Sequence, residues 1–165
     1  MTSYCILKTA LLGDLLLVAD EDHLNGVYYP DCRHAPAVEK DWRQRPGHAV
    51  LERASEEIQA YLRGDGAGFG VSLNCPGTAF QKAVWRQIAL IPFGETIPYT
   101  ELARRAGAPA AARAAGAATG QNPLSIVVPC HRVVGKNGTL TGYAGGLERK
   151  RLLLELEGRR KRAKN

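Results

Sequence analysis

Short apolar runs separated by turn residues mark the first third of the chain, and this pattern predicts β-strands. The runs lie at residues 5–8, 15–19 and 26–29. Gly13-Asp14 and an acidic segment at 20–22 provide the turns between them. We therefore expect a short antiparallel sheet, followed by a loop rich in Pro, Arg and His.

A helix is predicted next, because apolar residues between Leu51 and Leu62 recur mostly three or four positions apart. It is expected to end at Gly64. The glycine-rich segment 64–70 has the composition of a nucleotide-binding loop, but such a loop follows a strand and precedes a helix. Here the order is reversed, so we interpret the segment as a flexible connection and expect no cofactor.

The second half of the chain opens with a clear helix start. Thr78 and Gln81 have the spacing of a capping box, and apolar residues then recur on one face until Pro92 stops the helix. A loop at 142–146 precedes a last helix, predicted from Leu147 to Glu157 and ended by Gly158.

Two short helices are predicted between these segments, one over 101–106 closed by Gly107 and one from Pro109 to about Gly120. A helix pair joined by a turn that contains glycine is typical of a helix-turn-helix. The second helix is nearly pure alanine with one long cation, Arg113. Alanines let a helix approach a groove closely, but they also allow tight core packing, and the spacing leaves both interpretations open.

These elements predict an α/β (α+β) protein of two small domains. Residues 1–74 would form an N-terminal α/β domain with the short antiparallel sheet. Residues 75–158 would form a mostly helical C-terminal domain that contains the helix-turn-helix, and 159–165 a basic tail, expected to be disordered.

Charge is distributed unevenly between the two halves. Residues 1–74 carry 7 Lys or Arg against 11 Asp or Glu, a net −4, whereas 75–165 carry 15 against 5, a net +10. A basic half of this kind attracts polyanions, of which nucleic acid is the commonest inside cells. The alternative is a basic surface that is only solvated.

No secretory signal and no apolar run long enough for a bilayer occur, so we expect a soluble, cytoplasmic protein that binds no membrane. The chain has four cysteines: Cys5, Cys32, Cys75 and Cys130. Their spacing fits no common zinc module, and a disulfide framework is not expected. A metal site built from the first three with His23, His34 or His48 stays open, but ordinary thiols are favoured and no metal is predicted.

Cys130 is the leading candidate for chemistry. It follows Pro129 at the end of a predicted buried strand, 125–128, and strand ends beside loops expose reactive groups. If Pro129 begins a helical turn, Cys130 lies near the N-terminus of that turn. The partial positive charge there, together with His131 and Arg132, would lower the pKa of the Cys130 thiol. Adjacent side chains diverge, so His131 is expected to act on Cys130 through a water.

A cysteine hydrolase is the first alternative, because Cys/His pairs cleave esters and amides. Such enzymes take the histidine from a distant part of the chain. His131 is the single histidine of the basic half, so no second candidate is at hand.

The second half closely resembles the 6-O-methylguanine-DNA methyltransferases, nearly without a gap from Gly77 to Gly158. The first half is similar to that family only in size and character. The resemblance rests on spaced motifs in the family's order: Phe80-Gln81, Val84-Trp85, Ile91-Pro92-x-Gly94-x-Thr96, Tyr99, Ala112-Arg113-Ala114, Asn122-Pro123, PCHRVV at 129–134 and Gly142-Tyr143-Ala144-Gly145-Gly146.

The resemblance implies a role for each matching residue. The catalytic set would be Cys130 as alkyl acceptor, His131 as water-linked base, Glu157 orienting His131, Tyr99 near the target phosphate and guanine ring, and Asn122 tying the helix-turn-helix to the active-site turn. The DNA-binding set would be Arg113, which fills the gap left by a flipped base, with Tyr99, Thr100, Ala112, Ala114 and Ala115. The guanine-binding set would be Val133, Tyr143 and Ala144.

The implied activity is the irreversible, single-use transfer of an alkyl group from 6-O-alkylguanine in double-stranded DNA to Cys130 after base flipping, without a cofactor. Whether 4-O-alkylthymine is also repaired is left open, as is cooperative binding by a protein expected to be monomeric. Ala144 stands where some members have Ser, which puts fine substrate preference in doubt. A binding-only sensor of alkylated DNA and a helix-turn-helix regulator are the competing hypotheses.

Overall fold

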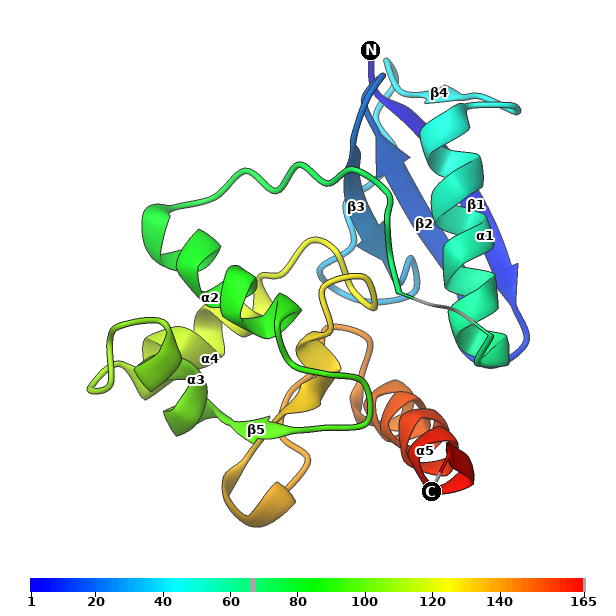
Figure 1. The fold of residues 1–165 in the computed structure, drawn as a ribbon. Helices are drawn as coiled ribbons and strands as arrows, with labels where there is room; N and C mark the ends of the chain where they lie inside the picture. Colours follow the sequence, from blue (N-terminus) through cyan, green and yellow to red (C-terminus); the bar gives the residue numbers. More distant parts are fainter. Residues whose placement is uncertain (66–67, 165) are drawn as a thin grey trace. The chain divides into compact units, whose positions relative to one another are not determined.

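The computed structural model describes residues 1–65 and 68–164, with side chains described as far as Arg159 (Figure 1). The chain divides into two compact units, Met1–Cys75 and Pro76–Asn165, one residue from the division expected between 74 and 75. The fold is the expected mixed α/β class, and each unit is built around its own elements.

The N-terminal unit contains a four-stranded sheet in the order β3-β2-β1-β4. Strands β1 (Ser3–Thr9), β2 (Gly13–Ala19) and β3 (Leu24–Tyr28) are antiparallel neighbours, whereas the short β4 (Arg43–Gln44) joins β1 in parallel. The three apolar runs of the sequence are thus strands, and β4 is an addition inside the segment predicted as a loop.

Helix α1 (Ala49–Arg63) packs on this sheet through the face that the apolar spacing predicts: Leu51, Ala54, Ile58 and Tyr61 are buried. It ends at Gly64, whose left-handed φ of 75° suits glycine at a helix C-terminus. Of the glycine-rich connection, Gly66 and Ala67 lie outside the described residues. Gly70 and Val71 are held by Glu57, whose carboxylate accepts hydrogen bonds from both backbone N–H groups.

The C-terminal unit begins with α2 (Ala79–Ala89), and the predicted capping box is present. Thr78 accepts from the N–H of Gln81, and the Gln81 side chain accepts from the N–H of Thr78. The buried indole of Trp85 donates to the carbonyl oxygen of Ala118 at 2.8 Å, which attaches this helix to α4 (Ala112–Gly120).

Helices α3 (Tyr99–Arg105) and α4 form the helix-turn-helix, with Gly107 at φ 82° in the turn between them. Both begin away from their predicted starts. Tyr99 already lies in α3, and α4 begins at Ala112 because Pro109 and Ala110 form part of the turn.

The predicted strand at 125–128 is wrong: this buried apolar segment is a tight turn. The N–H of Val127 donates to the carbonyl oxygen of Ser125, a γ-turn that puts Ile126 at φ 74°, a backbone conformation unfavourable for a β-branched residue. The strand lies later, as β6 (Val133–Val134), which pairs in parallel with β5 (Ile97–Pro98).

Two 3₁₀ turns, η1 (Cys130–Arg132) and η2 (Lys136–Gly138), flank β6, and α5 (Leu147–Lys164) closes the chain. This helix continues through Gly158, so the prediction that it ends there, before a disordered tail, is wrong. Gly158 does not adopt a positive φ, and a glycine inside a helix costs only about 1 kcal/mol. Strong helix formers on both sides offset that cost.

None of the helices in the described ranges has the length and apolar character needed to cross a membrane. Within residues 1–65 and 68–164, no three His, Cys, Asp or Glu side chains gather as metal ligands would.

Candidate active site

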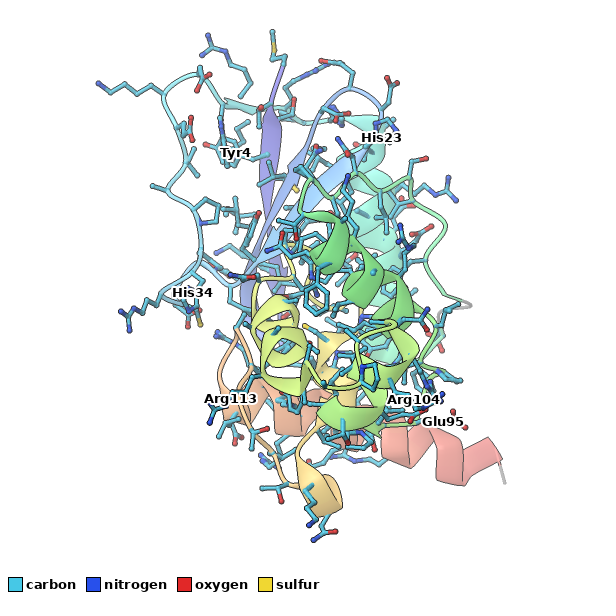
Figure 2. The ribbon with its side chains drawn as sticks, turned by 90° about the vertical axis from the view of Figure 1, so that its left-hand side faces the viewer. Tyr4, His23, His34, Glu95, Arg104 and Arg113 are labelled. Carbon is cyan, nitrogen blue, oxygen red and sulfur yellow. The ribbon has the colours of Figure 1, made fainter. Side chains whose placement is uncertain are left out.

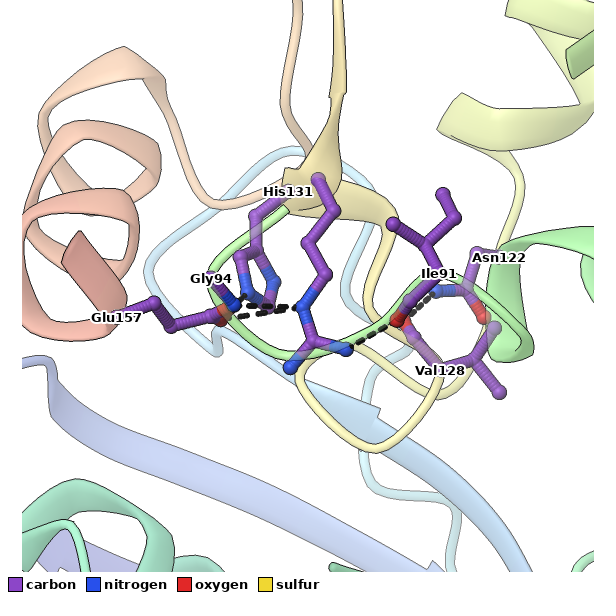
Figure 3. A network of polar contacts seen from close by, with 7 residues as sticks. Ile91, Gly94, Asn122, Val128, His131 and Glu157 are labelled. Atoms are coloured by element: carbon purple, nitrogen blue, oxygen red, sulfur yellow. Dashed lines mark hydrogen bonds and ion pairs between the residues drawn. The ribbon is translucent and has the colours of Figure 1, made fainter. Parts of the chain in front are cut away.

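A buried histidine–carboxylate pair lies at the centre of the C-terminal unit. Glu157, on α5, accepts a hydrogen bond from Nε2 of His131, in η1, at 2.5 Å (Figure 3). His131 is 0 % exposed and Glu157 1 %. The two residues are 26 positions apart, so only the packing of α5 against η1 brings them together.

The same carboxylate is held by two further donors. Nε of Arg132 donates to Oε1 of Glu157 at 2.7 Å, and the backbone N–H of Gly94 donates to the same oxygen at 3.0 Å. Nη1 of Arg132 reaches the carbonyl oxygen of Ile91 at 2.6 Å, and its guanidinium lies 5.8 Å from the ring centroid of Phe93. Arg132 therefore ties the 91–94 turn to Glu157 and fixes the carboxylate.

Burial and charge set the protonation of this pair. Burial by itself raises the pKa of Glu157, but the hydrogen bonds and charges of His131 and Arg132 outweigh it and lower that pKa to about 2. Burial lowers the pKa of His131, although Glu157 opposes the change. The carboxylate is thus ionised and the imidazole neutral near pH 7, which leaves the ring able to accept a proton.

Cys130 opens η1, directly before His131, and is 4 % exposed. Pro129 does begin a helical turn, but the expected lowering of the thiol pKa does not follow. Burial raises the pKa of Cys130, and it outweighs the opposing influence of the Asn122 side chain and the positive charge of Lys150. Desolvation wins because a thiolate loses more hydration than a short 3₁₀ turn returns.

Asn122 holds the turn that leads to Cys130. Its Nδ2 donates to the carbonyl oxygen of Val128 at 2.9 Å, and its Oδ1 accepts from the N–H of Leu124 at 3.0 Å. The asparagine lies two residues after the end of α4 and is buried. One side chain therefore joins the end of the helix-turn-helix to the turn that leads to Cys130.

Tyr99, at the start of α3, reaches the same site. Its hydroxyl donates to the carbonyl oxygen of Thr141 at 3.1 Å, and the charge of an ionised Cys130 is among the influences that raise the pKa of Tyr99 after burial. A Cβ added at Gly116 would lie 3.7 Å from Cδ1 of Tyr99, so the Tyr99 ring packs close to α4 at this glycine.

Of the residues expected to hold guanine, Val133 directly follows the turn of Cys130 and His131, and Tyr143 contacts His131. Val133 is fully buried in β6, whereas Tyr143 and Ala144 are half-buried in the loop before α5. The rings of Tyr143 and His131 meet edge to face, with centroids 6.5 Å apart.

Five of the six residues expected to touch DNA have accessible side chains, the half-buried Tyr99 included. Arg113 and Ala114 of α4 and Thr100 of α3 are exposed, and Ala112 is half-buried. Figure 2 shows Arg113 projecting outward from its helix. The prediction that Ala115 contacts DNA is wrong. Ala115 lies on the face of α4 that packs into the unit and is 0 % exposed, so its side chain cannot line a DNA groove.

Lys150 contacts the segments on both sides of this site, and the sequence analysis did not predict it. It is 0 % exposed, and its ammonium donates to the carbonyl oxygens of Val133, Thr141 and Gly142 at 2.7, 2.9 and 3.0 Å. A pattern in the chain could have found it. Lys150, Leu153 and Glu157 share one face of α5 at helical spacing, which puts two charges on the side that must be buried.

The chain is similar to known proteins along most of its length. A sequence profile described as 6-O-methylguanine DNA methyltransferase, DNA binding domain, matches residues 79–159. The methylated-DNA–protein-cysteine methyltransferase of Methanosarcina acetivorans is 43 % identical over 94 % of this chain and 97 % of its own length. An inducible one from Bacillus subtilis is 45 % identical over 92 % and 93 %.

The fold matches as well. A crystal structure of OGT from Mycobacterium tuberculosis in complex with DNA superposes with a TM-score of 0.88 at 41 % identity, covering 96 % of this chain and 94 % of that one. The family profile, the relatives and the fold thus define a methyltransferase of DNA repair. The chain belongs to the family of methylated-DNA–protein-cysteine methyltransferases.

Proposed function

We propose that this protein repairs 6-O-alkylguanine in double-stranded DNA by transferring the alkyl group irreversibly to Cys130. The thiolate sulfur attacks the alkyl carbon, a C–S bond forms, and the bond from carbon to O6 breaks. The electron pair goes to the guanine, which takes a proton and is restored. The thioether is stable, so each molecule acts once.

The observation that carries this proposal is the buried Glu157–His131 pair beside Cys130. The thiol must lose its proton to react, and burial opposes that loss. A neutral His131 held by an ionised Glu157 supplies an acceptor for the proton, reached through a water, and Glu157 stabilises the imidazolium that results. The relay provides, at the moment of reaction, the thiolate that the resting site disfavours.

The low exposure of Cys130 fits a base that is flipped out of the duplex and carried to the thiol. Arg113, on the exposed side of α4, would occupy the space that the base leaves in the stack. Tyr99 would then donate its hydroxyl hydrogen to the guanine ring and help the base depart as a leaving group. Val133, Tyr143 and Ala144 would read the edge of the base.

The test is incubation with duplex DNA that carries one 6-O-methylguanine, followed by intact and peptide mass spectrometry. We expect one methyl group per protein molecule, located on Cys130 and absent from Cys130→Ala. The other cysteines, Cys5, Cys32 and Cys75, are more exposed than Cys130 and provide an internal control. A general thiol reagent should modify them first, whereas the lesion should modify the buried thiol alone.

Two outcomes would reject the proposal. Binding without any gain in mass would favour a sensor of alkylated DNA, and methylation at one of the three half-buried cysteines would indicate alkylation that does not depend on a specific site. Affinity for DNA should also fall steeply as salt is added, because the basic C-terminal half releases counterions from the phosphates. A flat salt response would contradict the DNA-binding part of the proposal.

A further inference from the structure

Lys150 is a buried cation that is satisfied entirely by backbone. Within the described residues its ammonium makes no ion pair; its three N–H groups face the carbonyl oxygens of Val133, Thr141 and Gly142. Burying an ammonium is costly unless every proton finds an acceptor, and here three protons meet three acceptors. Among the described residues no opposite charge offsets the rest of the cost of burying this cation, so its position indicates a role beyond stability.

The three carbonyls belong to the two segments that flank the proposed guanine site. Val133 begins β6, which follows the turn of Cys130 and His131. Thr141 and Gly142 begin the loop that carries Tyr143 and Ala144 into α5. Lys150 therefore fastens the guanine-reading loop to the strand that leaves the reactive cysteine.

Tyr99 shares one of these acceptors. Its hydroxyl donates to the carbonyl oxygen of Thr141 at 3.1 Å, while the ammonium of Lys150 reaches the same oxygen at 2.9 Å and lies 5.9 Å from the centroid of the Tyr99 ring. A carbonyl oxygen has two lone pairs, so both are in use. Tyr99 can donate to a bound base only by giving up Thr141.

We propose that Lys150 is a positioning residue of the alkyl-transfer site. It holds the 141–146 loop against β6, so that the loop stays in place when the Tyr99 hydroxyl changes its hydrogen-bond acceptor from Thr141 to the guanine. This inference rests on the proposed function. The ammonium also puts a fixed positive charge beside Cys130 at the stage when the thiol must ionise.

The electrostatics around Lys150 agree with that second effect. Burial lowers the pKa of Lys150 to about 8, and a negative charge on Cys130 opposes this change. In return, Lys150 acts to lower the pKa of Cys130 and of His131. The groups that interact with it are thus Cys130, His131 and Tyr99, with Arg132 and Glu157 acting on the histidine. A thiolate is favoured by this charge, and an imidazolium is disfavoured.

The experiment compares Lys150→Met with wild type and with Arg151→Met. Methionine keeps most of the length but has neither charge nor N–H donors. Arg151, one residue away, pairs with Glu148 and Glu155 on the exposed side of α5, so its loss controls for removing a cation from this helix. Two quantities are measured: the methyl-transfer rate from duplex and from free 6-O-methylguanine, and the pH dependence of Cys130 alkylation by iodoacetamide, followed by peptide mass spectrometry.

For Lys150→Met we expect at least about a tenfold loss of transfer rate with both substrates, because a small displacement of the reading loop is enough for such a loss. The midpoint of Cys130 alkylation should move to higher pH, which a merely structural role would not predict. Arg151→Met should match wild type in both. Unchanged rate and midpoint in Lys150→Met would overturn the inference.

A double-mutant cycle on thermal stability tests whether Lys150 and Tyr99 share the carbonyl oxygen of Thr141. Tyr99→Phe should barely destabilise wild type, because Lys150 still holds the loop, but should clearly destabilise Lys150→Met. Additive effects would contradict the shared acceptor.

If Lys150→Met fails to fold, Lys150→Arg decides. A planar guanidinium keeps the charge but cannot aim three N–H groups as an ammonium does, so the midpoint should stay and the transfer rate should fall. A wild-type transfer rate in Lys150→Arg would overturn the positioning role. Alkylation by iodoacetamide does not depend on repair activity, so a wild-type protein inert toward 6-O-methylguanine would instead refute the proposed function.

Discussion

Asn122 donates its side-chain N–H to the carbonyl oxygen of Val128, two residues before Cys130, at 2.9 Å. Through this contact the C-terminal end of α4 is tied to the turn that places Cys130. The turn needs such support, because Ile126 is held at a positive φ that costs about 1–3 kcal/mol.

Asn122→Ala should therefore lose both stability and methyl transfer. The buried N–H of Leu124 would lose its acceptor, which costs about 1–3 kcal/mol, whereas the oxygen of Val128 would lose the Asn122 amide but keep the N–H of Cys130 as a donor. Urea unfolding measures the first effect and the single-turnover rate the second. Gln121→Ala, which removes an exposed hydrogen bond to Gln81 from the neighbouring position, is the control and should leave the rate unchanged.

Arg113→Ala should slow transfer from duplex DNA far more than transfer from free 6-O-methylguanine. Only the duplex requires a base to be extruded, so only there does a side chain that fills the stack contribute. Arg86→Ala removes one exposed cation from α2 of the same unit and controls for net charge. Equal losses with both substrates in Arg113→Ala would refute its role in the stack.

Glu157 should make stability depend on pH in acid. Its pKa of about 2 in the folded protein lies below the ordinary 4.5, so its stabilising contribution is complete above about pH 4.5 and is lost as pH falls toward 2. The wild-type free energy of unfolding should decline over that range, and Glu157→Gln should decline less. At pH 7 the variant should be less stable by about 3 kcal/mol, because Arg132 and His131 lose a buried partner.

Urea midpoints across pH provide the measurement for this prediction. Glu155→Gln, on the partly exposed side of the same helix, should keep the wild-type profile. An acid slope in Glu157→Gln as steep as that of wild type would show that other groups determine it.

Two glycines should respond in opposite directions to alanine. A Cβ at Gly77 would lie 2.7 Å from the Trp85 ring, so Gly77→Ala must displace an indole that holds α2 to α4, and it should destabilise the protein. A Cβ at Gly158 would meet nothing within 4 Å, and alanine is the better helix former, so Gly158→Ala should stabilise by up to about 1 kcal/mol. Thermal melts of both variants provide the check.

Local chemistry explains which parts of the fold could be predicted from the sequence. The capping box of Thr78 and Gln81, the glycine that ends α1 and the apolar face of that helix each depend on neighbours within one or two turns. The motif around Cys130 could also be recognised from the sequence, because its residues are neighbours in the chain. Such features need no knowledge of distant segments.

The errors have the opposite origin. Residues 125–128 have the composition of a buried strand, but the hydrogen bonds of Asn122 and the packing around Ile126 make them a turn. The alanines of α4 look alike in the sequence, and only packing separates exposed Ala114 from buried Ala115.

The sequence by itself therefore determined the first three strands, most of the helices, the basic half and the choice of Cys130 as the candidate thiol, since these follow from side-chain type and short-range spacing. Tertiary structure alone decided the pKa of the Cys130 thiol and the side chains that surround it. Burial raises its pKa, α5 brings Glu157 to His131 across 26 residues, and Lys150 reaches three carbonyls. Desolvation and contacts between distant segments exist only once the chain has packed.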